Sequence, residues 1–153
     1  MYVFIHLPLP AMFEEHLQKL PHGSEFCFID SIESLENGKS AEGKYTVKGD
    51  EAFLKGHFPD LPIMPGVILV ESVAQLAGVA VQSDSNSAPL ADLRLCAMKN
   101  VKIKGTAVPG QVMVISAEVT ARLGNLVQAK GAVFVNEEMI LSAELTLGGR
   151  LDQ

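Results

Sequence analysis

Residues 56–78 read GHFPDLPIMPGVILVESVAQLAG, and the second half of this stretch has the composition of a helix buried on every side. Between residues 66 and 81 the side chains are apolar or small, with Glu71, Ser72 and Gln75 as the polar exceptions. A helix that is hydrophobic around its whole circumference belongs in a protein interior. The stretch therefore predicts a long central helix.

Glu71 is the unusual residue of this helix. A glutamate is almost never fully buried without a partner or a task, because removing its charge from water is costly. His57 is the nearest candidate partner, and prolines 59, 62 and 65 make the link between it and the helix stiff and non-helical. From these residues alone two interpretations stay open: a charge pair that orders the core, or an acid–base pair of an active site.

The bulk composition predicts one domain that spans residues 1–153. At 153 residues with 48% hydrophobic content, the chain can build a single core, preceded by an N-terminal extension and short helix in residues 1–20. Twelve basic against eighteen acidic residues give a net charge of −6, which opposes a general attraction to nucleic acid or anionic membranes. We also expect no signal peptide and no membrane insertion, because the apolar start lacks a basic region and the long helix carries Glu71.

The cysteines and the remaining histidines indicate neither a disulfide framework nor a metal centre. Cys27 and Cys96 lie in apolar runs without CxxC spacing, so we interpret them as reduced core thiols, which favours a cytoplasmic setting. His6, His16 and His22 show no ligand spacing and are expected to be surface or packing residues. We therefore expect no metal.

The rest of the chain reads as strands joined by turns. Asn37-Gly38, Pro109-Gly110, Gly124-Asn125 and Asn136-Glu137 carry turn chemistry between apolar runs. Short connections between successive strands favour antiparallel pairing, and the predicted class is α+β, with a curved antiparallel sheet of about six strands wrapped around one long helix. The predicted strands are residues 25–35, 40–48, 92–104, 111–122, 126–136 and 139–147.

At this point the sequence resembles a known family, the hotdog-fold (3R)-hydroxyacyl-[acyl-carrier-protein] dehydratases of the FabZ type. The resemblance centres on the histidine of GHFP, the proline frame, the MPG helix start, the glutamate fourteen residues after the histidine and the following AQ. Weaker similarity runs from Leu20-Pro21-His22 to the final strands, over residues 18 to 148. The resemblance favours the active-site interpretation.

The resemblance implies a reaction and a role for each matched residue. The reaction removes water from a 3-hydroxyacyl thioester of lipid synthesis to give the trans-2-enoyl thioester. His57 would take the proton from C2 as a neutral imidazole, and Glu71 would protonate the departing hydroxyl, for which burial favours the uncharged carboxyl. Gly66 would offer its backbone N–H to the thioester carbonyl at the helix start, and Gln75, one turn after Glu71, would support the carboxyl. No cofactor is implied.

The resemblance also implies partners. The histidine and the glutamate come from different subunits in such enzymes, so a homodimer is expected to be the smallest active unit, with a trimer of dimers as a further possibility. The acidic acyl carrier protein would dock on Arg94, Lys99, Lys102 and Lys104, a run without acidic residues. The alternative interpretation of these four residues is a solvated strand edge protected by positive charge.

Two departures from the family pattern leave other functions open. Gly23-Ser24-Glu25 replaces the usual Arg-Tyr-Pro, and residues 102–106 read KIKGT where relatives have a basic run around a phenylalanine. These changes bear on carrier recognition and chain length and suggest a specialised member of the family. The alternatives are a dehydratase-isomerase, an acyl thioesterase, or a non-catalytic hotdog subunit that binds acyl chains.

Overall fold

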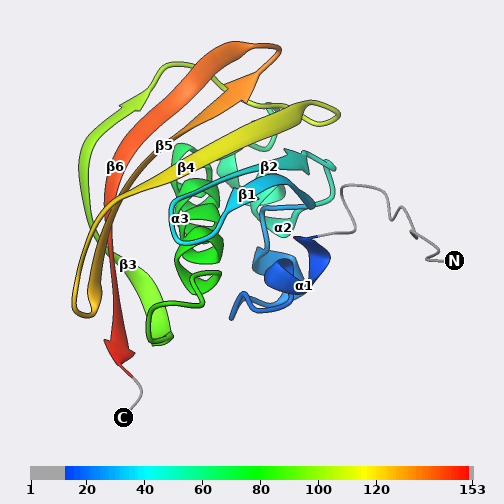
Figure 1. The fold of residues 1–153 in the computed structure, drawn as a ribbon. Helices are drawn as coiled ribbons and strands as arrows, with labels where there is room; N and C mark the ends of the chain where they lie inside the picture. Colours follow the sequence, from blue (N-terminus) through cyan, green and yellow to red (C-terminus); the bar gives the residue numbers. More distant parts are fainter. Residues whose placement is uncertain (1–12, 152–153) are drawn as a thin grey trace, which may run out of the picture.

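The computed structural model describes residues 13–151, in which a six-stranded sheet curves around one long helix (Figure 1). All helices precede β3, and the last four strands follow one another without a helix. The elements are α1 (Glu14–Leu17), the 3-10 helix η2 (Ser24–Phe26), β1 (Ser31–Glu36), β2 (Ser40–Thr46), α2 (Ala52–His57), α3 (Gly66–Gln82), β3 (Leu90–Ile103), β4 (Val112–Leu123), β5 (Leu126–Val135) and β6 (Glu138–Leu151).

The sheet is antiparallel throughout, with the strand order β1-β2-β4-β5-β6-β3. The predicted fold class is therefore confirmed, but the pairing of β3 differs from what its short connection to β4 suggests. β3 pairs with β6, and β4 pairs with β2 instead. As a result β3 forms one free edge of the sheet and β1 forms the other (Figure 1).

Two element predictions at the start of the chain are wrong in detail. The strand predicted for residues 25–35 begins only at Ser31, because residues 24–26 form η2. The helix α2 was not predicted, since its six residues AFLKGH are too few to show a helical period. Of the short helix expected before residue 20, the structure describes α1, while residues 1–12 and His6 lie outside the described part.

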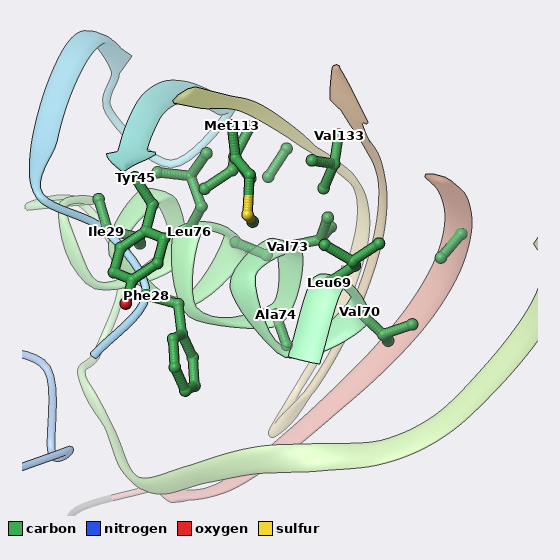
Figure 2. Packing of buried hydrophobic residues seen from close by; sticks show 14 of the residues in the cluster. Phe28, Ile29, Tyr45, Leu69, Val70, Val73, Ala74, Leu76, Met113 and Val133 are labelled. Carbon is green, nitrogen blue, oxygen red and sulfur yellow. The ribbon is translucent and has the colours of Figure 1, made fainter. Parts of the chain in front are cut away.

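The core lies between α3 and the concave face of the sheet. From Ser72 to Val81 every residue of α3 is buried, and Val73 and Leu76 point toward Met113 and Val133 of the sheet (Figure 2). Gly131 of β5 lets the helix approach closely, because a Cβ atom there would lie only 2.4 Å from Val73 Cγ1. The helix thus packs closely against the concave face of the sheet.

The first turn of α3 is only partly buried within one chain, in contrast to the predicted helix that is buried on every side. Val67 is 72% exposed, and Glu71 keeps about one fifth of its side chain accessible. The apolar surface at the start of the helix is therefore left uncovered by this chain.

The two cysteines are free, but neither is fully buried in the core as expected. Cys27 is half-buried after η2, whereas Cys96 is exposed on β3. Cys96 is exposed because β3 is an edge strand, so the interpretation of Cys96 as a core thiol is wrong. Among residues 13–151, no helix is both long and apolar enough to cross a membrane.

Candidate active site

Glu71 is held by a hydrogen bond from the next turn of its own helix. Gln75 Nε2 donates to Glu71 Oε1 at 3.1 Å, as their spacing of four residues on α3 allows. Gln75 itself is 2% exposed, so its side chain is fixed in the core. The carboxyl group of Glu71 therefore has a defined orientation.

Gln75 also fixes the segment that covers Glu71. Its Nε2 donates to the carbonyl of Phe26 at 2.9 Å, and its Oε1 accepts from the N–H of Phe28, also at 2.9 Å. One buried amide thus satisfies two backbone groups of the η2 segment together with the carboxyl of Glu71. The segment that contains the unusual Gly23-Ser24-Glu25 is tied to the site through this side chain.

His22 is a site residue that the sequence analysis missed. Its Nε2 lies 3.3 Å from Glu71 Oε1, and its ring packs against Phe26 with centroids 5.9 Å apart. We expected a surface or packing residue, because no metal-ligand spacing surrounds His22. The signal that could have found it is the Leu20-Pro21-His22 motif, which was noted as part of the family resemblance but given no role.

His57 lies at the end of α2, where one ring nitrogen is already engaged. Its Nδ1 lies 3.1 Å from the carbonyl oxygen of Ile63, in the proline-rich link that follows. A carbonyl can only accept, so Nδ1 carries the proton and Nε2 of the neutral ring is a free acceptor. The backbone thus selects the tautomer in which Nε2 can act as a base.

Gly66 begins α3, and its amide belongs to the unpaired N–H groups of the first turn. The first donors inside the helix are Ile68 and Leu69, which both bond to the carbonyl of Pro65. A Cβ atom at Gly66 would lie 2.5 Å from Ile103 Cδ1. A side chain at this position would therefore displace Ile103, whereas glycine leaves the amide accessible.

Glu71 lines a cavity of about 290 Å³ that runs along α3. Gln82 marks its other end, about 16 Å away at the helical rise of 1.5 Å per residue. Between them the wall is mainly apolar, with Ala74, Val79 and Leu93 among its residues. The shape and lining suit an extended apolar chain.

His57 is not among the residues that line this cavity. One chain therefore does not bring His57 and Glu71 into a common cavity, although both side chains are oriented by specific contacts. The ring of His57 lies against Phe58, which is 52% exposed, and the segment that follows carries two further exposed apolar side chains, Leu61 (57%) and Val67 (72%). Such a patch is typical of a surface that another molecule covers.

The four basic residues of the expected docking patch are all exposed, but they face different hollows. Arg94 lines the cavity of Glu71, whereas Lys99 and Lys102 each line a different hollow of the surface. Lys104 follows the end of β3. Within residues 13–151 none of the four forms an ion pair.

The same described residues contain no cluster of three His, Cys, Asp or Glu side chains that could hold a metal ion.

Comparison with known proteins relates this arrangement to one family. The model of the FabA-like domain matches residues 20–144. The 3-hydroxyacyl-[acyl-carrier-protein] dehydratase FabZ of Clostridioides difficile is 36% identical over 133 residues, which cover 86% of this chain and 92% of that protein. The FabZ of Caldanaerobacter subterraneus subsp. tengcongensis is 39% identical over 126 residues, which cover 82% and 89%.

Solved structures that resemble this fold come from enzymes of different activity. The dehydratase heterocomplex ApeI:P from Xenorhabdus doucetiae has a TM-score of 0.72 at 17% identity, with 86% of this chain and 88% of that chain covered. Zebra fish thioesterase superfamily member 2 has a TM-score of 0.68 at 15% identity, with 94% and 99% covered. At these identities the likeness shows the shared fold alone.

Proposed function

Because this chain belongs to the FabA-like family, with relatives that are 3-hydroxyacyl-[acyl-carrier-protein] dehydratases, we propose that it dehydrates a (3R)-hydroxyacyl thioester with His57 and Glu71. The product is the trans-2-enoyl thioester of fatty-acid or related lipid synthesis. The observation that carries this proposal is an oriented carboxyl group at the end of a mainly apolar cavity. An acid at this position faces the reacting end of a bound acyl chain.

The reaction moves two hydrogen ions. His57 Nε2 takes the proton from C2 of the thioester, and the electron pair of that C–H bond becomes the C2–C3 double bond. The bond between C3 and its hydroxyl breaks as Glu71 gives its proton to that oxygen, which leaves as water. The Gly66 N–H, at the positive end of α3, binds the thioester carbonyl while negative charge develops on its oxygen.

The site is complete only when a second copy of the chain supplies the missing group. The edge strand β3 carries exposed Met98 and Ile103, which are 57% and 55% exposed. A free sheet edge is a template for pairing with another strand. Two copies joined along β3 would extend the sheet, cover the apolar patch beside His57 and place that histidine opposite the partner's cavity. A trimer of dimers is a further level of assembly that the sequence resemblance implies.

The acyl carrier protein is the proposed macromolecular partner. Arg94 lines the cavity of Glu71 and is exposed, so it is the best placed of the four basic residues to meet an acidic carrier at the cavity. Lys99, Lys102 and Lys104 add positive charge along the same edge of the sheet. Long charged side chains also protect free sheet edges, so the two roles have to be distinguished. If these residues dock the carrier, replacing them should change the rate of association with the carrier and the salt dependence of that rate. A cytoplasmic location remains a prediction from the sequence.

The proposal is tested by following enoyl formation from a 3-hydroxyacyl carrier thioester. We expect the wild type to form the enoyl product. The rate should fall about 10²-fold or more in both His57→Ala and Glu71→Gln, since each variant lacks one of the two proton-transfer groups. Circular dichroism and thermal unfolding establish that both variants are folded. Equal rates in all three proteins, or no turnover by the wild type on short and long acyl chains, would refute the proposal.

A further inference from the structure

We propose that His22 is a positioning residue for Glu71, which keeps Oε1 occupied and directs the acid proton to Oε2. This inference rests on the proposed dehydration and assigns a role to a residue outside the pair described above. His22 approaches from the segment before η2, whereas Glu71 lies on α3, so the contact joins residues 49 positions apart in the sequence. It is a tertiary contact that the fold has to build.

The two groups that approach Glu71 converge on the same oxygen. Gln75 Nε2 lies 3.1 Å and His22 Nε2 lies 3.3 Å from Oε1. An oxygen that faces two nitrogen donors is the poorer place for a proton, because the proton would point at those donors. The acid proton of the neutral carboxyl therefore resides on Oε2, the oxygen that is left to face the substrate.

The second nitrogen of His22 defines which tautomer fits. His22 Nδ1 is buried and has no hydrogen-bond partner in the described part of the chain. A proton on Nδ1 would leave a buried donor unsatisfied, so the tautomer with its proton on Nε2 is favoured. In this tautomer the proton lies on Nε2, the nitrogen that is 3.3 Å from Glu71 Oε1.

The contact gains strength as the reaction proceeds. When Glu71 gives up its proton it becomes a carboxylate, and hydrogen bonds to a charged acceptor are about twice as strong as neutral ones. A separation of 3.3 Å is long for such a bond, but catalytic hydrogen bonds are often long in a free enzyme and tighten with substrate. His22 is therefore expected to stabilise the transition state more than bound substrate.

Other charged groups share the cavity but come from different elements. His16 belongs to α1, where its Nε2 lies 3.6 Å from Glu15, and Lys19 follows that helix. Asp92 and Arg94 face the cavity from β3. Of the ionisable side chains in the cavity wall, only His22 forms an ion-pair contact with Glu71 within residues 13–151.

The test compares two substitutions of His22 by steady-state kinetics on the 3-hydroxyacyl carrier thioester over a range of pH. His22→Phe keeps a ring against Phe26 but has no donor, whereas His22→Gln retains an N–H near the place of Nε2. We expect kcat of His22→Phe to fall about 10- to 100-fold, the value of one hydrogen bond to a charged group, with KM within about twofold. His22→Gln should recover most of that loss.

The pH profile separates positioning from a merely structural role. The His22 N–H favours the charged carboxylate of Glu71. Its loss should therefore move the alkaline limb of the pH profile of kcat to higher pH in His22→Phe, and by a smaller amount in His22→Gln. The matched control is His16→Phe, which removes the other histidine with a buried, unpartnered Nδ1 from the same cavity and should leave that limb in place. Thermal unfolding verifies that each variant is folded.

Two outcomes would overturn the inference. The first is wild-type kcat in both His22 variants, and the second is an equal loss in both with an unmoved alkaline limb. If His22→Phe fails to fold, His22→Leu takes its place as the variant without a donor, and the position of its alkaline limb relative to His16→Phe decides between the two roles. An inactive wild type would instead refute the proposed dehydration, so the two failures are distinguishable.

Discussion

At the scale of single residues, Gln75 connects the packing of the protein with its chemistry. Its amide is the only side chain in the described residues that hydrogen-bonds both Glu71 and the η2 segment. The carboxyl group, the covering segment and α3 therefore share one buried contact. A change at Gln75 should affect stability and catalysis together.

Gln75→Leu tests this connection. The substitution keeps the approximate size but leaves the Phe26 carbonyl and the Phe28 N–H without their partner, so we expect unfolding free energy to fall by about 2–4 kcal/mol. Chemical denaturation measures this loss. Gln128→Leu, at an exposed position of β5, is the control and should change the stability by less than about 0.5 kcal/mol. A Gln75 variant as stable as this control would contradict the account.

The sequence singled out Glu71 and its contact with Gln75, but it did not reveal His22. Glu71 and Gln75 stood out because polar residues are rare in an apolar helix, and their spacing indicated the contact. His22 was missed because nothing in its immediate sequence reveals a contact with a residue 49 positions away. Local pattern predicts which residues share a helix face, whereas contacts between distant segments depend on how the chain folds.

At the scale of elements, the connection from β2 to α2 positions His57. Glu51 precedes α2 and accepts hydrogen bonds from the Tyr45 hydroxyl, the Lys48 N–H and the Gly49 N–H, at 2.8, 2.8 and 2.7 Å. Lys48 also lies over the ring of Tyr45, with Nζ 4.1 Å from its centroid. This network fixes the start of the short helix that ends at His57.

The network makes stability depend on pH. Burial alone would raise the pKa of Glu51, but the hydrogen bonds from Lys48, Tyr45 and Gly49 lower it from the reference value of 4.5. The stabilisation is therefore complete above pH 4.5 and is lost as the pH falls through the lower pKa of the folded state. For Tyr45, burial and the bond to Glu51 raise the pKa of its hydroxyl, so it remains a donor throughout this range.

Glu51→Gln should thus be less stable than the wild type at neutral pH, and its stability should depend less on pH in the acid range. Urea unfolding between about pH 3 and pH 7 measures both effects. Glu137→Gln, in the exposed β5–β6 turn, serves as the control with the wild-type slope. If the slope of Glu51→Gln equals that of the wild type, the network does not stabilise the connection as described.

The elements were predicted from sequence to different degrees. α3 and the later strands have long periodic runs and clear turn dipeptides, and Asn136 and Glu137 indeed adopt positive φ in the β5–β6 turn. The short α2 lacked such a signal. The pairing of β3 with β6 could not be read from the chain, because the connection that follows β3 is compatible with several neighbours.

At the scale of the whole molecule, one chain keeps the two proposed catalytic groups apart. The cavity with Glu71 and the exposed apolar surface around His57 belong to the same subunit but not to the same cavity. The free edge at β3 offers the surface through which two copies would bring these groups together. The assembly is therefore expected to be part of the catalytic mechanism.

The most direct test of this account is complementation between two inactive variants. His57→Ala and Glu71→Gln are co-expressed in equal amounts and assayed as the purified mixture, beside each variant alone. Random pairing of subunits restores both groups in one site of every mixed dimer, so we predict about one quarter of wild-type activity. A mixture that contains mixed dimers, as shown by two different affinity tags, yet is as inactive as its parents would contradict a site shared between subunits.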